Sequence, residues 1–140
     1  KEYYKKIFKN NFKFIPRDQK RDNFKISDNS KIVININSTL GYEALSRGTK
    51  TAFFSVRSKD NKFISTRFNW PASIPKKGKF WTNSSSPREI NRILNFLKNT
   101  THLKWKKIID KDHSNKLIFD YNNTIFKNLA KNINLPIKNL

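Results

Sequence analysis

Residues 31–56, KIVININSTLGYEALSRGTKTAFFSV, contain the pattern that decides the fold. Residues 31–36 (KIVINI) and 51–56 (TAFFSV) are short β-branched or aromatic runs, typical of strands covered on both faces. Residues 40–47 (LGYEALSR) predict a short helix that ends at Gly48, which can adopt a left-handed cap. Two strands joined by a helix form a βαβ unit, whose strands pair in parallel through a right-handed crossover. We therefore expect an α/β domain with a mostly parallel sheet flanked by helices.

The rest of the chain contains weaker signals for further elements. Residues 86–89 (SPRE) have the pattern of a capping box with proline at the first helical position, and an apolar stripe follows to about Lys98. Residues 57–79 lack periodicity and carry Pro71 and Pro75, which predicts a long irregular connection. The remaining expectations are an amphipathic helix at 1–9, a turn at 24–30, a buried segment beginning at Phe80 and Trp81, a helix around Trp105, a short strand at 117–119 and a terminal helix at 124–132.

The composition limits the class of protein. The chain has 140 residues and no cysteine or methionine. This length fits one domain over residues 1–140, and the absence of cysteine excludes a disulfide scaffold, a cysteine-ligated zinc site and a thiol nucleophile. No apolar run approaches the roughly 20 residues of a membrane span, and the N-terminus lacks the apolar core of a signal peptide. Because the chain begins at Lys1 and lacks methionine, we expect it to be the C-terminal part of a longer protein.

The charge predicts an anionic partner. Lysine and arginine number 30 against 10 aspartate and glutamate, a formal net charge of +20. Nucleic acid is one candidate, since basic side chains neutralise phosphates. However, lysine is spread along the chain together with asparagine and isoleucine, which is the bias of an AT-rich coding sequence. We therefore favour nucleotide diphosphates and acidic membrane surfaces over nucleic acid. The aromatic content of 14% excludes a disordered basic tail, because it supplies bulky side chains for a core.

The polar turn after the first strand is the candidate ligand site. In an open α/β sheet, ligands bind beyond the carboxyl ends of strands, where the amides of a helix N-terminus suit a phosphate. Ser38 and Thr39 add hydroxyl donors, Gly41 allows close approach to the backbone, and Glu43 can accept hydrogen bonds from a ribose. The alternative is structural, since a serine before a helix is commonly an N-cap worth ~1 kcal/mol and a nearby glutamate complements the helix dipole. The sequence has neither a P-loop nor a G-x-G-x-x-G motif.

A series of short stretches along the chain forms a second, wider pattern. They are residues 14–17 (FIPR), 36–48 (INSTLGYEALSRG), 51–54 (TAFF), 67–71 (RFNWP), 78–83 (GKFWTN) and 119–123 (FDYNN). In this order they resemble a family of bacterial surface-carbohydrate biosynthesis proteins, which are similar to glycosyltransferases of the B type with two Rossmann-like domains. The resemblance implies a Rossmann-like three-layer domain, the C-terminal half that binds the nucleotide sugar. The chain departs from the pattern at Asn37, where aspartate is expected, and at Asn69, where glycine is expected; the first departure removes a carboxylate beside the turn.

The resemblance also assigns donor-binding positions. They are Ser38, Thr39, Gly41 and Glu43; Arg17 and Arg57, each of which follows an apolar segment, are further candidates. The first three would hold the donor phosphates, and Glu43 would face the ribose or base. The two arginines are candidate phosphate clamps, because guanidinium pairs with phosphate bidentately, or else solvated cations. Trp70, Phe80 and Trp81 are candidates for lining the sugar pocket, although core packing is the stronger interpretation.

These inferences predict the donor-binding half of a glycosyltransferase that assembles cell-surface polysaccharide or lipopolysaccharide. A helix N-terminus and basic groups would stabilise the leaving phosphate, so neither a metal nor a cofactor beyond the nucleotide-sugar substrate is expected. The general base is expected on an N-terminal acceptor domain, so this part alone would bind donor without turnover. The alternatives are a basic nucleic-acid-binding module and a degenerate domain that only mediates assembly. The expected location is the cytoplasm, with the inner-membrane surface as a place of peripheral contact.

Overall fold

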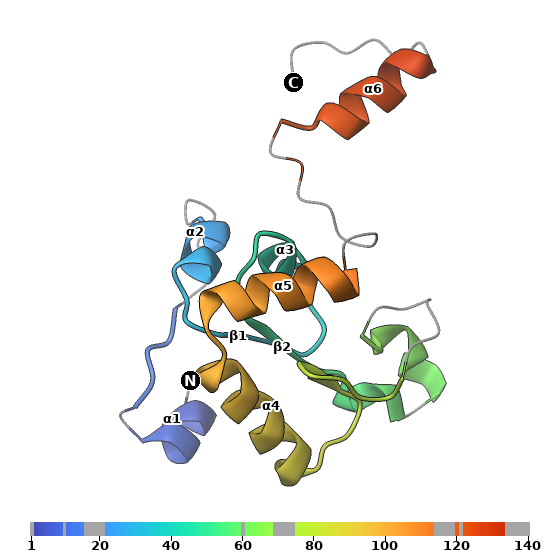
Figure 1. Ribbon diagram of the computed structural model, residues 1–140. Coiled ribbons are helices and arrows are strands. Elements are labelled where there is room, and N and C mark those ends of the chain that lie inside the picture. The colour runs from blue at the N-terminus through green and yellow to red at the C-terminus, as the bar shows by residue number, and fades with distance from the viewer. Residues whose placement is uncertain are drawn as a thin grey trace.

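The computed structural model describes residues 2–9, 11–15, 22–59, 61–68, 75–113, 120 and 122–133 (Figure 1). In chain order, the elements are α1 (Glu2–Phe8), α2 (Asn23–Asp28), β1 (Val33–Asn35), α3 (Thr39–Ser46), β2 (Thr51–Phe54), the 3-10 helices η1 (Val56–Lys59) and η2 (Asn61–Thr66), β3 (Trp81–Thr82), α4 (Pro87–Asn99), α5 (His102–His113) and α6 (Thr124–Asn132). The predicted helices near both ends of the chain, after residue 86 and around Trp105 are confirmed.

The described strands form one parallel sheet in the order β1-β2-β3. Val33 lies opposite Thr51, and Phe53 lies opposite Trp81. Since α3 joins β1 to β2, the predicted βαβ unit with parallel strands is confirmed. The buried segment expected at Phe80 becomes the third strand, which pairs with β2.

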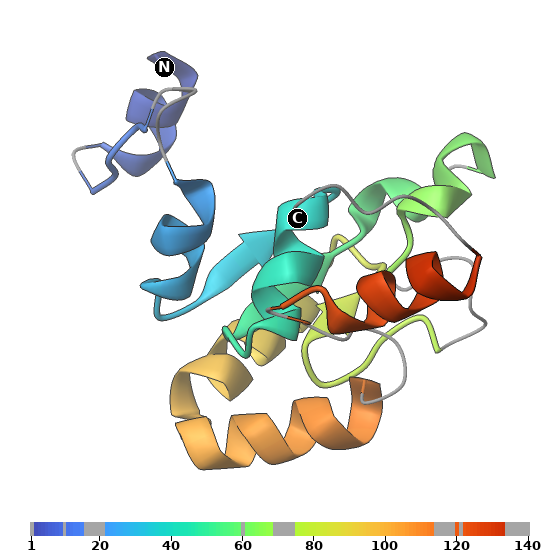
Figure 2. The same ribbon diagram turned by 90° about the horizontal axis from the view of Figure 1, so that it is seen from above.

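Helices cover both faces of this sheet. α3 contacts β1 and β2, whereas α4 contacts β2 and β3, and Figure 1 shows α3 above the sheet and α4 below it. Figures 1 and 2 together place α6 beyond α3, on the side of the sheet away from α4. The described part of the chain is therefore an α/β arrangement consistent with a Rossmann-like domain of three strands.

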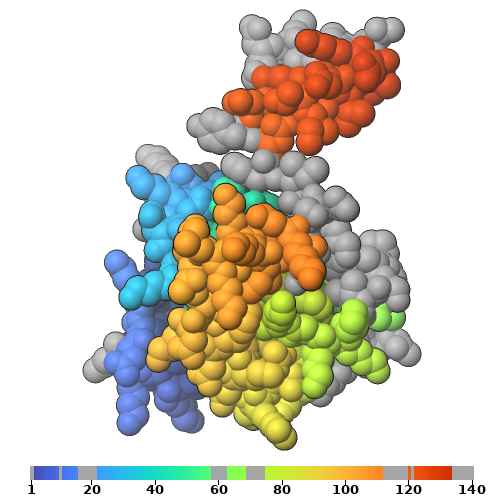
Figure 3. Space-filling view, viewed as in Figure 1, coloured from blue at the N-terminus to red at the C-terminus, as the bar shows by residue number. Residues whose placement is uncertain are grey.

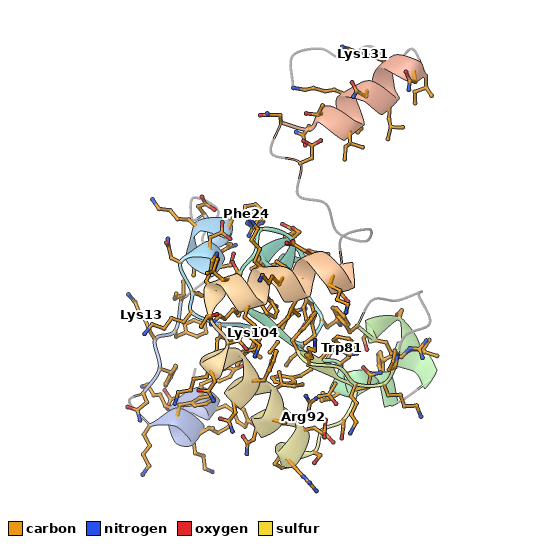
Figure 4. All side chains as sticks on the ribbon, viewed as in Figure 1. Lys13, Phe24, Trp81, Arg92, Lys104 and Lys131 are labelled. Atoms are coloured by element: carbon orange, nitrogen blue, oxygen red, sulfur yellow. The ribbon has the colours of Figure 1, made fainter. Side chains whose placement is uncertain are left out.

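Aromatic side chains fill the core. The ring centroid of Phe53 lies 4.5 Å from that of Phe68, and Phe80 meets Trp105 edge-on at 5.2 Å. Trp105 is fully buried, and its indole N–H donates to the carbonyl of Gly48 at 2.9 Å. Trp81, labelled in Figure 4, packs its ring 5.1 Å from that of Phe68. Phe80 is fully buried in this cluster, as the core-packing interpretation expects.

β1 is not covered on both faces, so that prediction was wrong. Ile34 is 57% exposed and Ile36 is 51% exposed, whereas Asn35 between them is buried. β1 is the edge strand of the described sheet, and α3 covers the face that carries Asn35. The β-branched run predicted a strand correctly, but a local pattern does not reveal which neighbour covers each face.

The turn predicted at 24–30 was also wrong over most of its length. Helix α2 begins at Asn23, and the carboxylate of Asp22 caps it by accepting from the Lys25 N–H at 3.0 Å. The chain turns only at Asn29, which is the C-cap residue. Similarly, the connection predicted as irregular after residue 56 contains the 3-10 helices η1 and η2. The strand predicted at 117–119 lies outside the described residues.

The capping box at the start of α4 does not form. Ser86 is the N-cap residue and Pro87 follows it, as predicted, but the Ser86 side chain makes no capping hydrogen bond. Glu89 instead pairs with Arg92 at 3.1 Å and with Lys77 at 3.5 Å. Arg92, one turn further along α4, and Lys77, from outside this helix, therefore draw the carboxylate away from the helix terminus.

Candidate functional site

The site lies where the parallel strands end. The carboxyl ends of β1 and β2 meet at the same edge of the sheet, and a cavity of about 130 Å³ opens there. Ser38 and Thr39, which follow β1, line the cavity together with Ser55, which follows β2, and residues 65–67 at the end of η2. Tyr42 and Phe53 supply its aromatic wall.

The polar lining consists mainly of hydroxyl groups. They belong to Ser38, Thr39, Ser55, Ser65 and Thr66, with Tyr42 beside them. Arg67 is the single charged residue among the described residues that line the cavity. A small cavity with many hydroxyl donors, one guanidinium group and no carboxylate is chemically suited to an anion such as a phosphate group.

The turn after β1 is organised by Asn35. The Asn35 Oδ1 atom accepts a hydrogen bond from the Ser38 N–H at 3.1 Å, and the Ser38 Oγ atom accepts from the Leu40 N–H at 3.3 Å. The Gly41 N–H donates to the Ser38 carbonyl at 3.2 Å. Ser38 is therefore the N-cap of α3, as the structural interpretation expects, while its hydroxyl hydrogen is still able to donate.

Gly41 has a structural reason to lack a side chain. A Cβ atom on residue 41 would overlap the Cγ atom of the Asn35 side chain. The space beside Gly41 thus accommodates the Asn35 carboxamide, which itself holds the turn in place. The sequence analysis expected this glycine to let a ligand approach the backbone, whereas in the structure the Asn35 side chain lies beside it.

The other predicted site residues lie at varying distances from the cavity. Glu43 is half-buried one turn into α3, and Arg57 is exposed in η1; neither lines the cavity. Arg17 lies outside the described residues. The structure therefore brings Ser38 and Thr39 together with Arg67, which the site prediction had not included, although the RFNWP stretch contained it.

A further polar group at this edge of the sheet lacks a partner. The Asn83 Oδ1 atom, just after β3, is buried and accepts no hydrogen bond from any described residue. The Asn83 N–H donates to the Lys76 carbonyl at 3.0 Å. Within the described part of the chain, no three of the aspartate, glutamate and histidine side chains gather as a metal ion would require.

The fold and this cavity define an α/β protein with a parallel sheet and an anion-compatible cavity at the carboxyl edge of its strands. The family described as "putative O-antigen biosynthesis protein" matches residues 1–134, so the chain belongs to this family. The match supports a place in surface-carbohydrate biosynthesis, the field that the resemblance implied. No curated protein matches the chain, and no solved structure matches it. None of the helices in the described residues has the length and apolar character needed to cross a membrane.

Proposed function

We propose that this chain is the nucleotide-sugar binding domain of a glycosyltransferase that acts in bacterial surface-polysaccharide assembly. The observation that carries the proposal is the cavity at the carboxyl edge of β1 and β2, which hydroxyl side chains line together with Arg67, its one charged residue among those described. Its position is the one at which open α/β sheets bind ligands. The O-antigen biosynthesis family supplies the biological setting.

The size of the cavity suggests which part of the donor enters it. A volume of about 130 Å³ is well below the ~300–1,000 Å³ of pockets that enclose whole small ligands. In the proposed complex, the cavity takes a donor phosphate, and the nucleoside and sugar lie outside it. Glu43, on the following turn of α3, is the residue we propose to contact the ribose or base, and Arg57 and Arg17 remain proposed phosphate contacts.

The proposed chemistry is stabilisation of the leaving group. When the glycosidic bond to the sugar breaks, negative charge develops on the departing phosphate oxygen. Arg67, the hydroxyls of Ser38 and Thr39, and the positive end of the α3 dipole would stabilise that charge without moving. An acceptor domain would supply the base that takes the proton from the acceptor hydroxyl.

Calorimetric titration with UDP, CMP and GDP tests this proposal. We expect saturable binding of one nucleotide, weakened about tenfold or more in Arg67→Gln and in Ser38→Ala, because each removes a phosphate contact. Ser46→Ala is the matched control, since this hydroxyl donates to the Glu43 carbonyl at the other end of α3. Thermal denaturation verifies that each variant is folded. If a folded chain binds none of the three nucleotides, the donor-binding proposal is wrong, and a domain that mediates assembly is favoured.

A further inference from the structure

A second and larger cavity lies at the opposite edge of the sheet, where β1 and β2 begin. Its volume is about 690 Å³, within the range of cavities that hold small molecules. Its walls come from the end of α2, the start of β1, the α3–β2 connection and the junction of α4 and α5. Figure 3 shows the blue-to-cyan atoms of α2 and the segment after it beside the gold and orange atoms of that junction.

Basic side chains dominate the lining of this cavity. Its titratable members are Lys31, Arg47, Lys50, Lys98, His102 and Asp28. The carboxylate of Asp28 is neutralised by Arg47, whose Nε atom lies 2.8 Å from Oδ1 and 3.0 Å from Oδ2. Arg47 also donates to the Ser27 hydroxyl at 3.0 Å and lies over the ring of Phe24. Asp28 is the one acidic residue among the described lining residues, and it is already paired with Arg47. No described carboxylate of the lining therefore neutralises the other basic side chains.

Lys50 is occupied by the end of α4. Its Nζ atom donates to the carbonyl of Leu97 at 3.1 Å and also to the carbonyl of Thr100. These are unpaired carbonyls at a helix C-terminus, where the helix dipole places negative charge. Lys50 thus satisfies the carbonyls and offsets that charge, which would otherwise repel an anion from this wall.

Three groups are left to meet a ligand. Lys31, Lys98 and His102 line the cavity, and none of their side chains has a hydrogen bond or ion pair with another described residue. Helix α5 also begins here, with the Thr101 hydroxyl accepting from the Lys104 N–H at 3.3 Å, so its positive dipole end lies at this edge. Apolar wall is supplied by Ile32, which is half-buried.

We infer that this cavity binds a small organic phosphate, with the phosphate between Lys31 and Lys98 and the apolar part of the ligand against Ile32. Lysine ammonium groups bind phosphate as mobile point charges. The volume far exceeds that of a phosphate group, so the ligand carries a further moiety. This site is separate from the cavity at the carboxyl edge, and its occupancy does not depend on the donor-binding proposal.

Phenyl phosphate is a suitable probe, because it joins one phosphate to one apolar ring. A titration of the ¹⁵N-labelled chain, followed by NMR, is expected to shift the amides of Ile32, Gly48 and His102 saturably. We expect Lys31→Gln/Lys98→Gln to weaken binding about tenfold or more. The control pair Lys106→Gln/Lys111→Gln removes the same charge from exposed positions of α5 outside the cavity; it should weaken binding by less than about threefold.

Several results would overturn the inference. One is a set of amide shifts centred on Ser38 and Thr39. Another is equal weakening of phenyl phosphate binding by the two double variants, and a third is amide shifts that do not saturate. Equal weakening would mean that the net charge of the chain attracts phosphate without a site. Inorganic phosphate should bind less tightly than phenyl phosphate; equal affinity would contradict the apolar contact. The single variants Lys31→Gln and Lys98→Gln provide the same comparison if the double variant does not give a folded spectrum.

Discussion

The carboxamide of Asn35 occupies the space beside the Cα atom of Gly41, so that the last residue of β1 and the first turn of α3 fit together without a side chain between them. The same carboxamide accepts from the Ser38 N–H at 3.1 Å. The geometry of the candidate phosphate turn therefore depends on this pair of residues.

Gly41→Ala is expected to destabilise the protein by about 1–3 kcal/mol, because the new Cβ displaces the Asn35 side chain. This cost exceeds the gain of up to about 1 kcal/mol that alanine brings to a helix. Urea denaturation measures the change in the free energy of unfolding. The double variant Asn35→Ala/Gly41→Ala should lose less than the sum of the two single variants; additive losses would contradict the proposed contact.

The two N-cap serines should respond differently to alanine. The Ser38 hydroxyl accepts from the Leu40 N–H, whereas Ser86 makes no side-chain capping bond. We expect Ser38→Ala to cost about 1 kcal/mol of stability and Ser86→Ala to change it by less than about 0.5 kcal/mol. Denaturant midpoints of the two variants, measured side by side, test whether the loss of stability is larger at Ser38. A larger loss at Ser86 would show that a capping box forms there in solution.

Trp105→Phe should be among the most damaging conservative substitutions. It opens a void beside Phe80 and leaves the Gly48 carbonyl without its indole donor, which predicts a loss of about 2–4 kcal/mol. Trp81→Phe is the control, since its indole N–H donates to the Pro75 carbonyl in an exposed setting. We expect a loss of about 1 kcal/mol there. Thermal unfolding followed by circular dichroism measures both, and a similar loss in the two variants would refute the assignment of Trp105 to the core.

The ion pairs of Glu89 give the stability a pH dependence. Partial burial raises the pKa of the Glu89 carboxyl, but hydrogen bonds and charges from Arg92 and Lys77 outweigh it, so the pKa lies below its ordinary value of 4.5. A lowered pKa in the folded chain means that the stabilisation is complete above about pH 4.5 and is lost as the pH falls through the folded pKa. Arg92, labelled in Figure 4, also donates to the Gly78 carbonyl at 2.8 Å.

Glu89→Gln should therefore lower the urea midpoint at neutral pH, and the difference from the native chain should shrink below about pH 4.5. In an Arg92→Met background, the effect of Glu89→Gln and its pH dependence should both be smaller. A difference in urea midpoint between the native chain and the Glu89→Gln variant that stays constant from neutral pH into the acid range would contradict this account.

The parts of the fold that could be predicted are those encoded within a few residues. The βαβ unit was predicted because its two apolar runs and the Gly48 stop are local signals, and α4 was predicted from its apolar stripe. The open face of β1 was missed because exposure of Ile34 depends on what packs against it. The capping box failed for a similar reason, since Lys77 reaches Glu89 from a distant segment.

The candidate site was only partly predictable. The turn containing Ser38 and Thr39 follows from its place after a strand, whereas Arg67 reaches the cavity through η2, a helix that carries no periodic signal. The cavity at the opposite edge could not be predicted at all. Lys31 and Lys98 are far apart in the sequence, and they stand among many other lysines that look the same.

The exposed edge strand β1 has a consequence for the behaviour of the protein at high concentration. Ile34 and Ile36 lie beside the unpaired margin of the described sheet, where a strand of another molecule could be added. Mutual repulsion between chains of net charge +20 opposes such an encounter. Salt shortens the range of that repulsion, from about 30 Å at 0.01 M to about 8 Å at 0.15 M. Colloidal stability should thus fall as ionic strength rises, and we expect a dilute, low-salt buffer to keep this protein monodisperse.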